Sequence, residues 1–311
     1  MFGSGLCIPV IATEAQFLNL AILCCKAQLS RFSSRVPTHL IILNKVCRSY
    51  WLRRSSLDSE GIKCQSKKTA ELVDCEYADL NIKEIYGRGQ IGHVRIRQHV
   101  NPLSLLFRVP MQAPDWDIVF DDCKLPLMVD IGTGSGRFLM WLAKRFYNSR
   151  NCVGLEIRQK LVQRSQFWVK ELALRNIHFI STNATISFDD LVSSYPGPLI
   201  FVSVLCPDPH FKKRHHKRRI LQKPLVDSIL KNLTTGGQVY MQSDVLEVAM
   251  SMRDHFDPQA DLLKHIHAID PSFSCDVDGW LLHNPMGIRT EREVHAELQG
   301  ARIYRRLYQK I

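Results

Sequence analysis

The stretch LMVDIGTGSGRFLMWLA, residues 127–143, decides how this chain of 311 residues folds. An apolar run ends on a carboxylate, Asp130, and three glycines follow at alternate positions, Gly132, Gly134 and Gly136. Apolar residues then recur at the three- and four-residue spacing of one helix face. The pattern predicts a strand, a glycine turn and a helix, an arrangement in which backbone amides approach a ligand at the positive end of the helix.

The spacing of the glycines indicates the kind of ligand. A dinucleotide fingerprint, Gly-x-Gly-x-x-Gly, needs a glycine where this chain has Arg137 or Leu139. The pattern Asp-x-Gly-x-Gly-x-Gly is instead similar to the first motif of S-adenosylmethionine-dependent methyltransferases. A second apolar run, CVGLEI, carries the carboxylate Glu156, which can accept hydrogen bonds from both hydroxyls of a ribose. Together the two runs favour a nucleoside-containing cofactor and disfavour a dehydrogenase.

The composition is that of an ordinary globular protein, with an apolar fraction of 45%. The ten cysteines include no Cys-x-x-Cys pair and no cluster at zinc spacing. No stretch reaches ~18 uninterrupted apolar residues. We therefore expect a reducing compartment, no metal and no membrane span. The formal net charge of +11 is concentrated in residues 1–57 and residues 212–219, each of which carries +6.

Residues 1–57 contain seven Lys or Arg, one acid and many serines, without a core-forming period. This composition is typical of an organellar transit peptide, and the serine content favours a chloroplast over a mitochondrion. The alternative is a disordered tail on a cytoplasmic or nuclear protein. We expect residues 58–122 to be an extension that lies over the catalytic domain, and residues 123–311 to be that domain.

From residue 125 onward, apolar runs typical of strands alternate with helical patterns. This order predicts an α/β fold, a mostly parallel sheet with helices on both faces. Residues 301–308 alternate like a strand with one polar face and would suit an added antiparallel strand. The expected strands are 125–131, 152–157, 176–181, 198–205 and 236–242, and the expected helices are 136–147, 159–174, 187–194, 218–232 and 245–255.

In an open α/β sheet the ligand lies beyond the carboxyl ends of the strands. Asn183 and Ala184 follow the third strand, and the amide suits an adenine edge. The fourth strand ends on residues 206–210, Cys-Pro-Asp-Pro-His, where two prolines fix the backbone around Asp208. Phe211 and six cations follow directly, a pattern typical of phosphate binding. A rigid carboxylate beside such a run indicates a nucleic-acid substrate.

Together these segments resemble the tRNA (guanine-N7-)-methyltransferase family. The resemblance is carried by VDIGTGSGRF, GLEIR, the Asn183-Ala184 pair, PDPHFKKRHHKRR, Ser243-Asp244 and residues 289–293. The segment around Arg97 is also similar, so the resemblance covers about residues 95–309. It implies a class I methyltransferase (Rossmann-like) fold with an antiparallel C-terminal strand. It also implies that a methyl group passes from S-adenosylmethionine to N7 of a guanine in tRNA.

Carried over position by position, the resemblance implies an active-site residue, a cofactor group and a substrate group, and the cationic run adds a fourth set of residues. Asp208 matches the residue given as the active site, and it is expected to contact the guanine or mainly the cofactor. The cofactor group is Asp130, Gly132, Gly134, Gly136, Glu156, Ile157, Asn183, Ala184 and Leu205. The substrate group is Lys212, Asp244, Thr290 and Glu293. The cations expected on the RNA backbone are Lys213, Arg214, Lys217, Arg218 and Arg219.

Two alternatives stay open. A class I methyltransferase that acts on another RNA base, such as an adenine N6, usually has Asn-Pro-Pro-aromatic where this chain has Asp208. A non-catalytic RNA-binding subunit with the same fold would be favoured by a broken glycine turn or a lost Asp208, and neither is seen. The sequence leaves open which tRNAs are chosen and whether a partner subunit is needed.

Overall fold

The computed structural model describes residues 59–82 and 100–311, with side chains from residue 68 onward in the first range. Of these, residues 63–311 belong to one compact unit. Two expectations fall outside the described residues. These are the transit peptide, residues 1–57, and the family similarity around Arg97.

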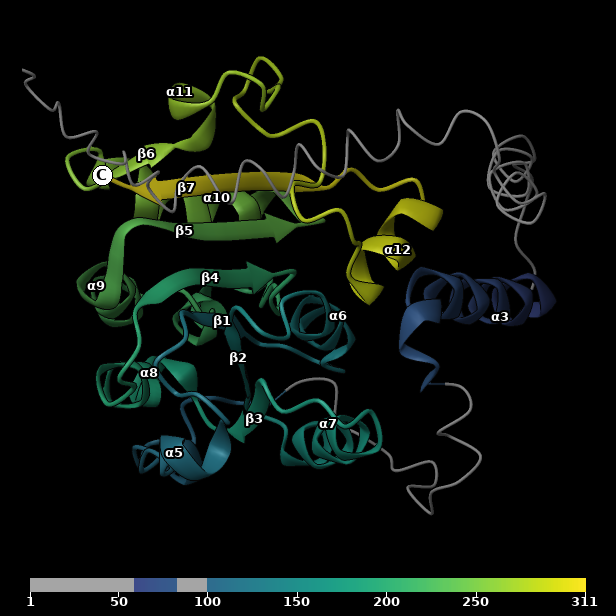
Figure 1. The fold of residues 1–311 in the computed structure, drawn as a ribbon. Helices are drawn as coiled ribbons and strands as arrows, with labels where there is room; N and C mark the ends of the chain where they lie inside the picture. The colour runs from purple at the N-terminus through teal and green to yellow at the C-terminus, as the bar shows by residue number, and fades with distance from the viewer. Residues whose placement is uncertain (1–58, 83–99) are drawn as a thin grey trace, which may run out of the picture. The chain divides into compact units, whose positions relative to one another are not determined.

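A sheet of seven strands runs through the unit in the order β3-β2-β1-β4-β5-β7-β6 (Figure 1). β1 to β5 pair in parallel, and β7 is antiparallel to both of its neighbours. The predicted fold class is confirmed, and so is the antiparallel strand at the C-terminal end. The strands are β1 Leu127–Ile131, β2 Asn151–Glu156, β3 Ile177–Ser181, β4 Leu199–Leu205, β5 Leu233–Ser243, β6 Leu263–His265 and β7 Tyr304–Lys310.

The central strands are apolar runs because both of their faces are covered. Every residue of β1 and β2 is buried, as is usual for parallel strands between two layers of helices. The register places Asp130 of β1 beside Ser203 of β4 on one side and Gly154 of β2 on the other. The acid at the end of the first strand therefore lies inside the sheet, directly before the glycine turn.

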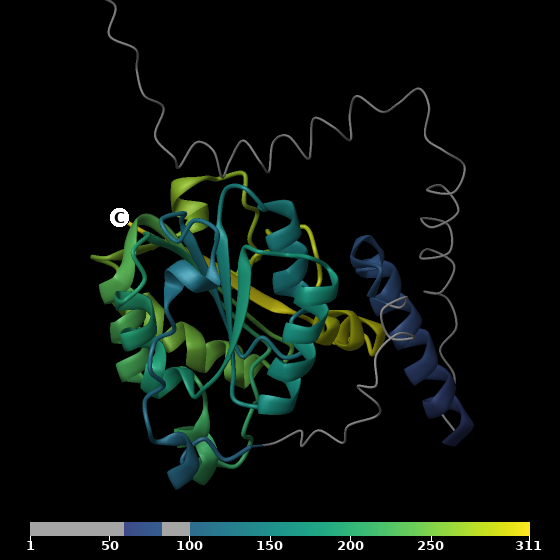
Figure 2. The ribbon, with the colours of Figure 1, turned by 60° about the horizontal axis from the view of Figure 1, so that its bottom comes forward.

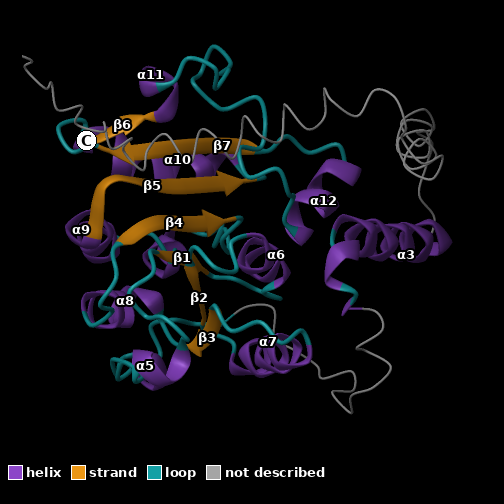
Figure 3. Cartoon of the chain, in the orientation of Figure 1, coloured by secondary structure: helices purple, strands orange, loops and turns teal. Residues whose placement is uncertain are grey.

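Helices cover both faces of the sheet (Figure 2; coloured by type in Figure 3). α6, α7 and α12 contribute to the core on one face, and α5, α8, α9 and α10 to the core on the other. No helix in the described ranges is long and apolar enough to cross a membrane. The helices are α3 Ser59–Glu76, α5 Trp116–Val119, α6 Arg137–Arg145, α7 Gln159–Glu171, α8 Ala184–Ser193, α9 Lys223–Asn232, α10 Leu246–Phe256, α11 Ile266–Ile269 and α12 Glu291–Leu298, with short 3₁₀ turns η2 Ala78–Leu80, η3 Leu105–Phe107, η4 Lys213–Arg218 and η5 Asp257–Gln259.

Several details differ from the sequence prediction. The elements α3, α5, β6, α11 and α12 were not predicted, and α8 and β5 each begin three residues earlier than expected. The cationic run forms η4, so α9 begins at Lys223 rather than at residue 218, with proline in its first turn. The expected single polar face of residues 301–308 is wrong, because β7 carries a buried arginine on each face. Arg305 and Arg306 are each 7% exposed, and they pair with Glu293 and Asp257.

Candidate active site

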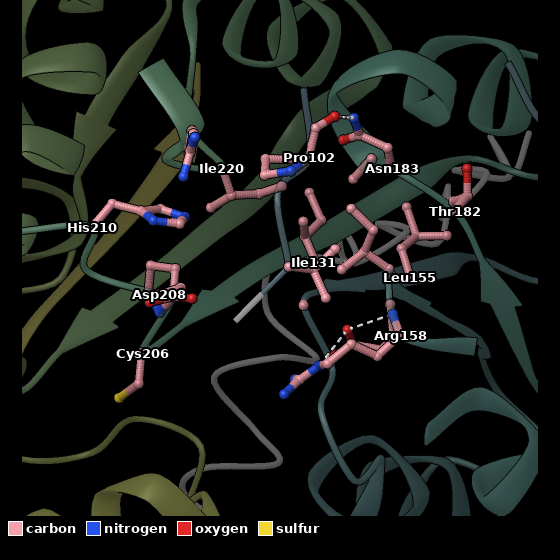
Figure 4. A pocket seen from close by; sticks show the side chains of 17 residues that line it. Pro102, Ile131, Leu155, Arg158, Thr182, Asn183, Cys206, Asp208, His210 and Ile220 are labelled. Carbon is pink, nitrogen blue, oxygen red and sulfur yellow. Dashed lines mark hydrogen bonds and ion pairs between the residues drawn. The ribbon is translucent and has the colours of Figure 1, made fainter. Parts of the chain in front are cut away.

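A cavity of about 270 Å³ lies at the carboxyl ends of the parallel strands. Figure 4 shows Asp208 on one side of it, Asn183 on the other, and the apolar Ile131 and Leu155 between them. Of the predicted site residues, those that line the cavity are Gly132, Glu156, Ile157, Asn183, Ala184, Asp208 and Arg218. Those that do not line it are Asp130, Gly134, Gly136, Leu205, Lys212, Lys213, Arg214, Lys217, Arg219, Asp244, Thr290 and Glu293.

The glycine turn after β1 serves both the cavity and the helix behind it. Gly132, Gly134 and Gly136 have φ of 78°, 60° and 78°, a region that L side chains rarely adopt. A Cβ on Gly136 would lie 2.6 Å from Phe179 Cζ, whereas a Cβ on Gly132 would meet no atom within 4 Å. Gly136 is thus required by packing, and Gly132 leaves room for a ligand at the cavity.

Glu156, at the end of β2, already accepts four hydrogen bonds and is 3% exposed. Oε1 accepts from the backbone N–H and Nε of Arg158, at 3.0 and 2.9 Å. Oε2 accepts from the backbone N–H of Gly134 at 3.0 Å and from Arg158 Nη2 at 2.9 Å. Because a carboxylate offers about four acceptor positions, a ribose can bond to Glu156 only where one of these partners withdraws.

The guanidinium of Arg158 stays charged at this position. Burial by itself lowers the pKa of Arg158, but its hydrogen bonds to Glu156 and the nearby charge of Asp208 raise that pKa above its ordinary value. Arg158 therefore lies in the fields of both carboxylates, one at the predicted cofactor end of the cavity and one at the predicted reaction centre.

Asp130 lies behind the glycine turn and is 3% exposed. Its Oδ1 accepts a hydrogen bond from Ser203 Oγ at 2.6 Å. Burial raises the pKa of Asp130 to about 6, although the bond from Ser203 acts in the opposite direction. The side chain joins β1 to β4 beneath the turn. It thereby supports Ile131 and Gly132, the next two residues, which line the cavity.

Asn183 caps α8 and also holds the segment that follows residue 100. Its Oδ1 accepts from the backbone N–H of Thr185 at 3.2 Å. Its Nδ2 donates to the carbonyl oxygens of Pro102 and Phe107, at 3.2 Å each. The amide that was expected to read an adenine edge is thus bonded within the chain, at a point where Pro102 also lines the cavity.

The loop that carries Asp208 has an unusual backbone at both ends. Cys206 and His210 have φ of 48° and 46°, in the left-handed region that non-glycine residues rarely adopt. The backbone N–H of Cys206 donates to the carbonyl of Gln242 in β5 at 2.8 Å. Asp208 is therefore presented by a short loop whose conformation depends on contacts from outside it.

The cationic run after this loop separates into two groups. Lys212, Lys213, Arg214 and Lys217 are exposed to solvent. Arg218 lines the cavity, and Arg219 is 9% exposed. The expectation that all five cations from 213 to 219 reach the RNA backbone does not fit this geometry, because the guanidinium of Arg219 is turned inward.

The predicted substrate residues at the end of β5 and the start of α12 are bonded to one another and to neighbouring strands. Thr290 and Glu293 form a capping box at the start of α12. Glu293 has no exposed surface and accepts from Gln242 Nε2 at 3.1 Å and Arg305 Nη2 at 2.5 Å. Asp244 pairs with Arg292 of α12 at 2.5 Å. These contacts fix α12 against β5 and β7.

The sequence interpretation missed two residues, Arg158 and Gln242, that bond to predicted site residues. Arg158 stands in the quoted GLEIR segment, only two positions after Glu156, so its proximity was available as a signal. Gln242 has no such signal, because its side chain contacts Cys206, Thr290 and Glu293, which lie 36 to 51 residues away.

Comparisons with known proteins show which family this chain resembles. A family model described as "Putative methyltransferase" matches residues 124–305. A tRNA (guanine-N(7)-)-methyltransferase from Synechococcus elongatus is 41% identical over 219 residues, 70% of this chain and 97% of that protein. One from Synechocystis sp. is 40% identical over 220 residues, 71% of this chain and 99% of that protein. Among solved structures, an rRNA methylase from Streptococcus thermophilus has a TM-score of 0.39 at 12% identity, over 60% of this chain and 88% of that chain. Because the identity to the two named relatives extends over nearly their whole length, the chain belongs to the tRNA (guanine-N(7)-)-methyltransferase family.

Proposed function

We propose that this chain transfers a methyl group from S-adenosylmethionine to N7 of a guanine in tRNA, the activity for which its relatives are named. The observation that carries the proposal is the position of Asp208. The end of β4 places it in the cavity wall, and the exposed cations Lys213, Arg214 and Lys217 follow within nine residues. One loop thus connects the cavity to a surface that can bind phosphates.

The residues around the cavity fit the nucleoside part of S-adenosylmethionine. The open space at Gly132 admits a ligand, the side chains of Ile131 and Leu155 supply apolar walls, and Glu156 supplies a carboxylate for the ribose. When bound, the cofactor supplies an electrophilic methyl group on a sulfonium. We assign to its binding the cavity-lining residues Gly132, Glu156, Ile157, Asn183 and Ala184, and to the support of its walls Asp130, Gly134, Gly136 and Leu205.

The chemistry requires alignment more than proton transfer. N7 of guanine has a lone pair and no proton to lose, so no general base is needed. N7 provides the electron pair of the new N–CH₃ bond while the S–CH₃ bond breaks and its electron pair goes to the sulfur, so the positive charge moves from the sulfonium to the guanine. An ionised Asp208 can accept hydrogen bonds from the N1–H and N2–H₂ edge, opposite N7, and offset that charge. Holding the base in line with the methyl group then supplies most of the rate.

The remaining substrate residues act around this centre. Lys212 follows the loop of Asp208 and is exposed, so it serves a phosphate of the tRNA. Thr290, Asp244 and Glu293 are bonded within the chain. They support the substrate side by fixing α12, and Glu293, which has no exposed surface, does so without touching the RNA.

The direct test is to incubate the purified chain with bulk tRNA and S-adenosylmethionine labelled in the methyl group. Digestion and mass spectrometry should find the label in 7-methylguanosine. Asp208→Asn should lower kcat about 100-fold or more, because it removes the charge that faces the cationic product. Asp227→Asn, which removes an acid paired with Lys223 on the surface of α9, is the matched control. Label in another base or in protein, or full turnover by Asp208→Asn, would refute the assignment.

We also propose that residues 1–57 are a chloroplast transit peptide. Residues 58–122 then form an extension, and residues 123–311 form the methyltransferase domain. The family model begins at residue 124, and the composition of residues 1–57 is that of a transit peptide. The relatives named above are cyanobacterial, which supports a chloroplast. Residues 1–57 fused to a fluorescent protein should enter the organelle, and a reporter that stays in the cytosol would contradict the address.

A further inference from the structure

The loop that presents Asp208 needs support from outside. Two non-glycine residues in the left-handed region, Cys206 and His210, flank it, and this backbone conformation is strained for any residue with a Cβ. Such a conformation persists only where surrounding contacts hold it. At the start of the loop the contact is the hydrogen bond from Cys206 N–H to Gln242 O. At its end the contact comes from Arg219.

Arg219 connects the end of the loop to helix α10. Its Nε donates to the carbonyl oxygen of Pro209 at 3.0 Å, and Pro209 directly follows Asp208. Its Nη2 donates to Glu247 Oε1 at 2.6 Å, in the first turn of α10. His216 Nε2 lies 3.1 Å from the same Nη2. The guanidinium is thus engaged on both sides, at 9% exposure.

We propose that Arg219, anchored by Glu247, is a positioning residue that holds the Pro-Asp-Pro loop in its reactive conformation, rather than a contact to the RNA backbone. The inference rests on the proposed function. The loss of Arg219 should lower the rate of methyl transfer and leave the affinity for tRNA unchanged. Lys213, Arg214 and Lys217, which are exposed, have the opposite role: they set the affinity and not the rate.

Variants of Glu247 can distinguish the two possible roles of Arg219, because Glu247 is an acid and is not itself expected to bind a phosphate. If Arg219 positions the loop, Glu247→Ala removes its anchor and lowers kcat. If Arg219 instead contacts a phosphate, Glu247→Ala frees a cation and leaves kcat unchanged. Glu247→Gln is the matched control, since it removes the same charge but keeps an oxygen that can accept from Arg219. The side chain of Glu247 is 53% exposed, so neither change disturbs the core.

The experiment measures kcat and KM for tRNA with the full-length wild-type chain, Glu247→Ala, Glu247→Gln and Arg219→Lys. Arg219→Lys keeps the charge but loses the fork that reaches Pro209 and Glu247 together. We expect kcat to fall about 10- to 100-fold in Arg219→Lys, as small misplacements of a reactive group do. The loss of one anchoring bond in Glu247→Ala should lower kcat about fivefold. Glu247→Gln should turn over like the wild type.

Binding supplies the second readout. Arg219→Gln should leave the salt dependence of tRNA binding unchanged, and the thermal midpoints and cofactor affinities of the Glu247 variants should match those of the wild type. Equal kcat in Glu247→Ala and the wild type, or a salt slope that falls by about one in Arg219→Gln, would overturn the inference. The comparison is made on whichever substrate the wild-type chain methylates. Failure of tRNA as a substrate therefore refutes only the proposed function.

Discussion

Replacing Lys213, Arg214 and Lys217 together by glutamine should weaken tRNA binding and reduce its dependence on salt. All three side chains are exposed on one short segment, η4, beside the loop of Asp208. Each cation that neutralises a phosphate contributes about 0.7 to 0.9 to the slope of log K against log salt. Three contacts therefore account for about 2 to 3 units of slope. Between about 50 and 200 mM salt, the ratio of the tRNA affinity of the wild type to that of the variant should fall about 20- to 40-fold.

Fluorescence anisotropy with a labelled tRNA transcript measures this slope over a series of salt concentrations. The matched control replaces Lys223 and Lys231, which are also exposed lysines but pair with Asp227 and Asp189. These charges are already balanced on the surface of α9 and α8, so their removal should leave the slope unchanged. Cofactor affinity should be the same in all variants, because none of these side chains lines the cavity.

An unchanged slope in the triple variant would show that the exposed cations are only a solvated face of the protein. An equal loss in the control would show that the effect comes from total charge rather than from this segment. Either result would refute the reasoning that connects η4 to the tRNA backbone.

The other predictions concern single side chains around the cavity. Phe211, 66% exposed beside the Asp208 loop, offers a stacking surface, so Phe211→Ala should weaken tRNA binding by about 1–3 kcal/mol without changing the salt slope. Glu156→Gln leaves one acceptor oxygen instead of two and should weaken cofactor binding at least about tenfold in calorimetry, whereas unchanged affinity would remove Glu156 from the ribose site. Folding raises the pKa of Asp130 to about 6, against about 3.9 in an unfolded chain, so its contribution to stability is full below pH ~4 and is lost as pH rises to about 6. Denaturation at several pH values should show that the free energy of unfolding falls by up to about 3 kcal/mol as the pH rises through this range. The variant Asp130→Asn, which keeps an oxygen for Ser203, should not show this fall.

The parts of the fold that the sequence predicts are those whose signal is local. β1 and β2 are buried along their whole length, so they stand out as apolar runs. β6 is only three residues long and carries no period. The two buried arginines of β7 could not be foreseen, because Glu293 and Asp257, which neutralise them, lie 12 and 49 residues away.

The candidate site shows the same division. Topology alone brings the strand ends together, so Glu156, Asn183 and Asp208 meet at one cavity as the sequence predicts. The sequence does not reveal which partner each side chain takes. Arg218 and Arg219 are adjacent in the same cationic run, yet one lines the cavity and the other supports the loop of Asp208 from behind. That difference depends on where η4 ends and on the position of α10, and neither is encoded within the run.

If Glu156 binds the ribose of the cofactor, as we propose, that binding must exchange hydrogen bonds that Glu156 already accepts within the chain. Of the four bonds to Glu156, two come from the backbone N–H groups of Gly134 and Arg158, which a side-chain rotation cannot withdraw. The other two come from the guanidinium of Arg158, whose side chain is 28% exposed and could leave Glu156 by a change of rotamer. A ribose bound at Glu156, as we propose, would therefore replace that guanidinium, and the buried carboxylate would keep a partner in both states. Arg158 also lies close enough to Asp208 for that carboxylate to raise its pKa. If the ribose and the guanine bind where we propose, displacement of the guanidinium from Glu156 by the ribose would therefore also change the charge near Asp208, and cofactor binding would affect the substrate side of the cavity.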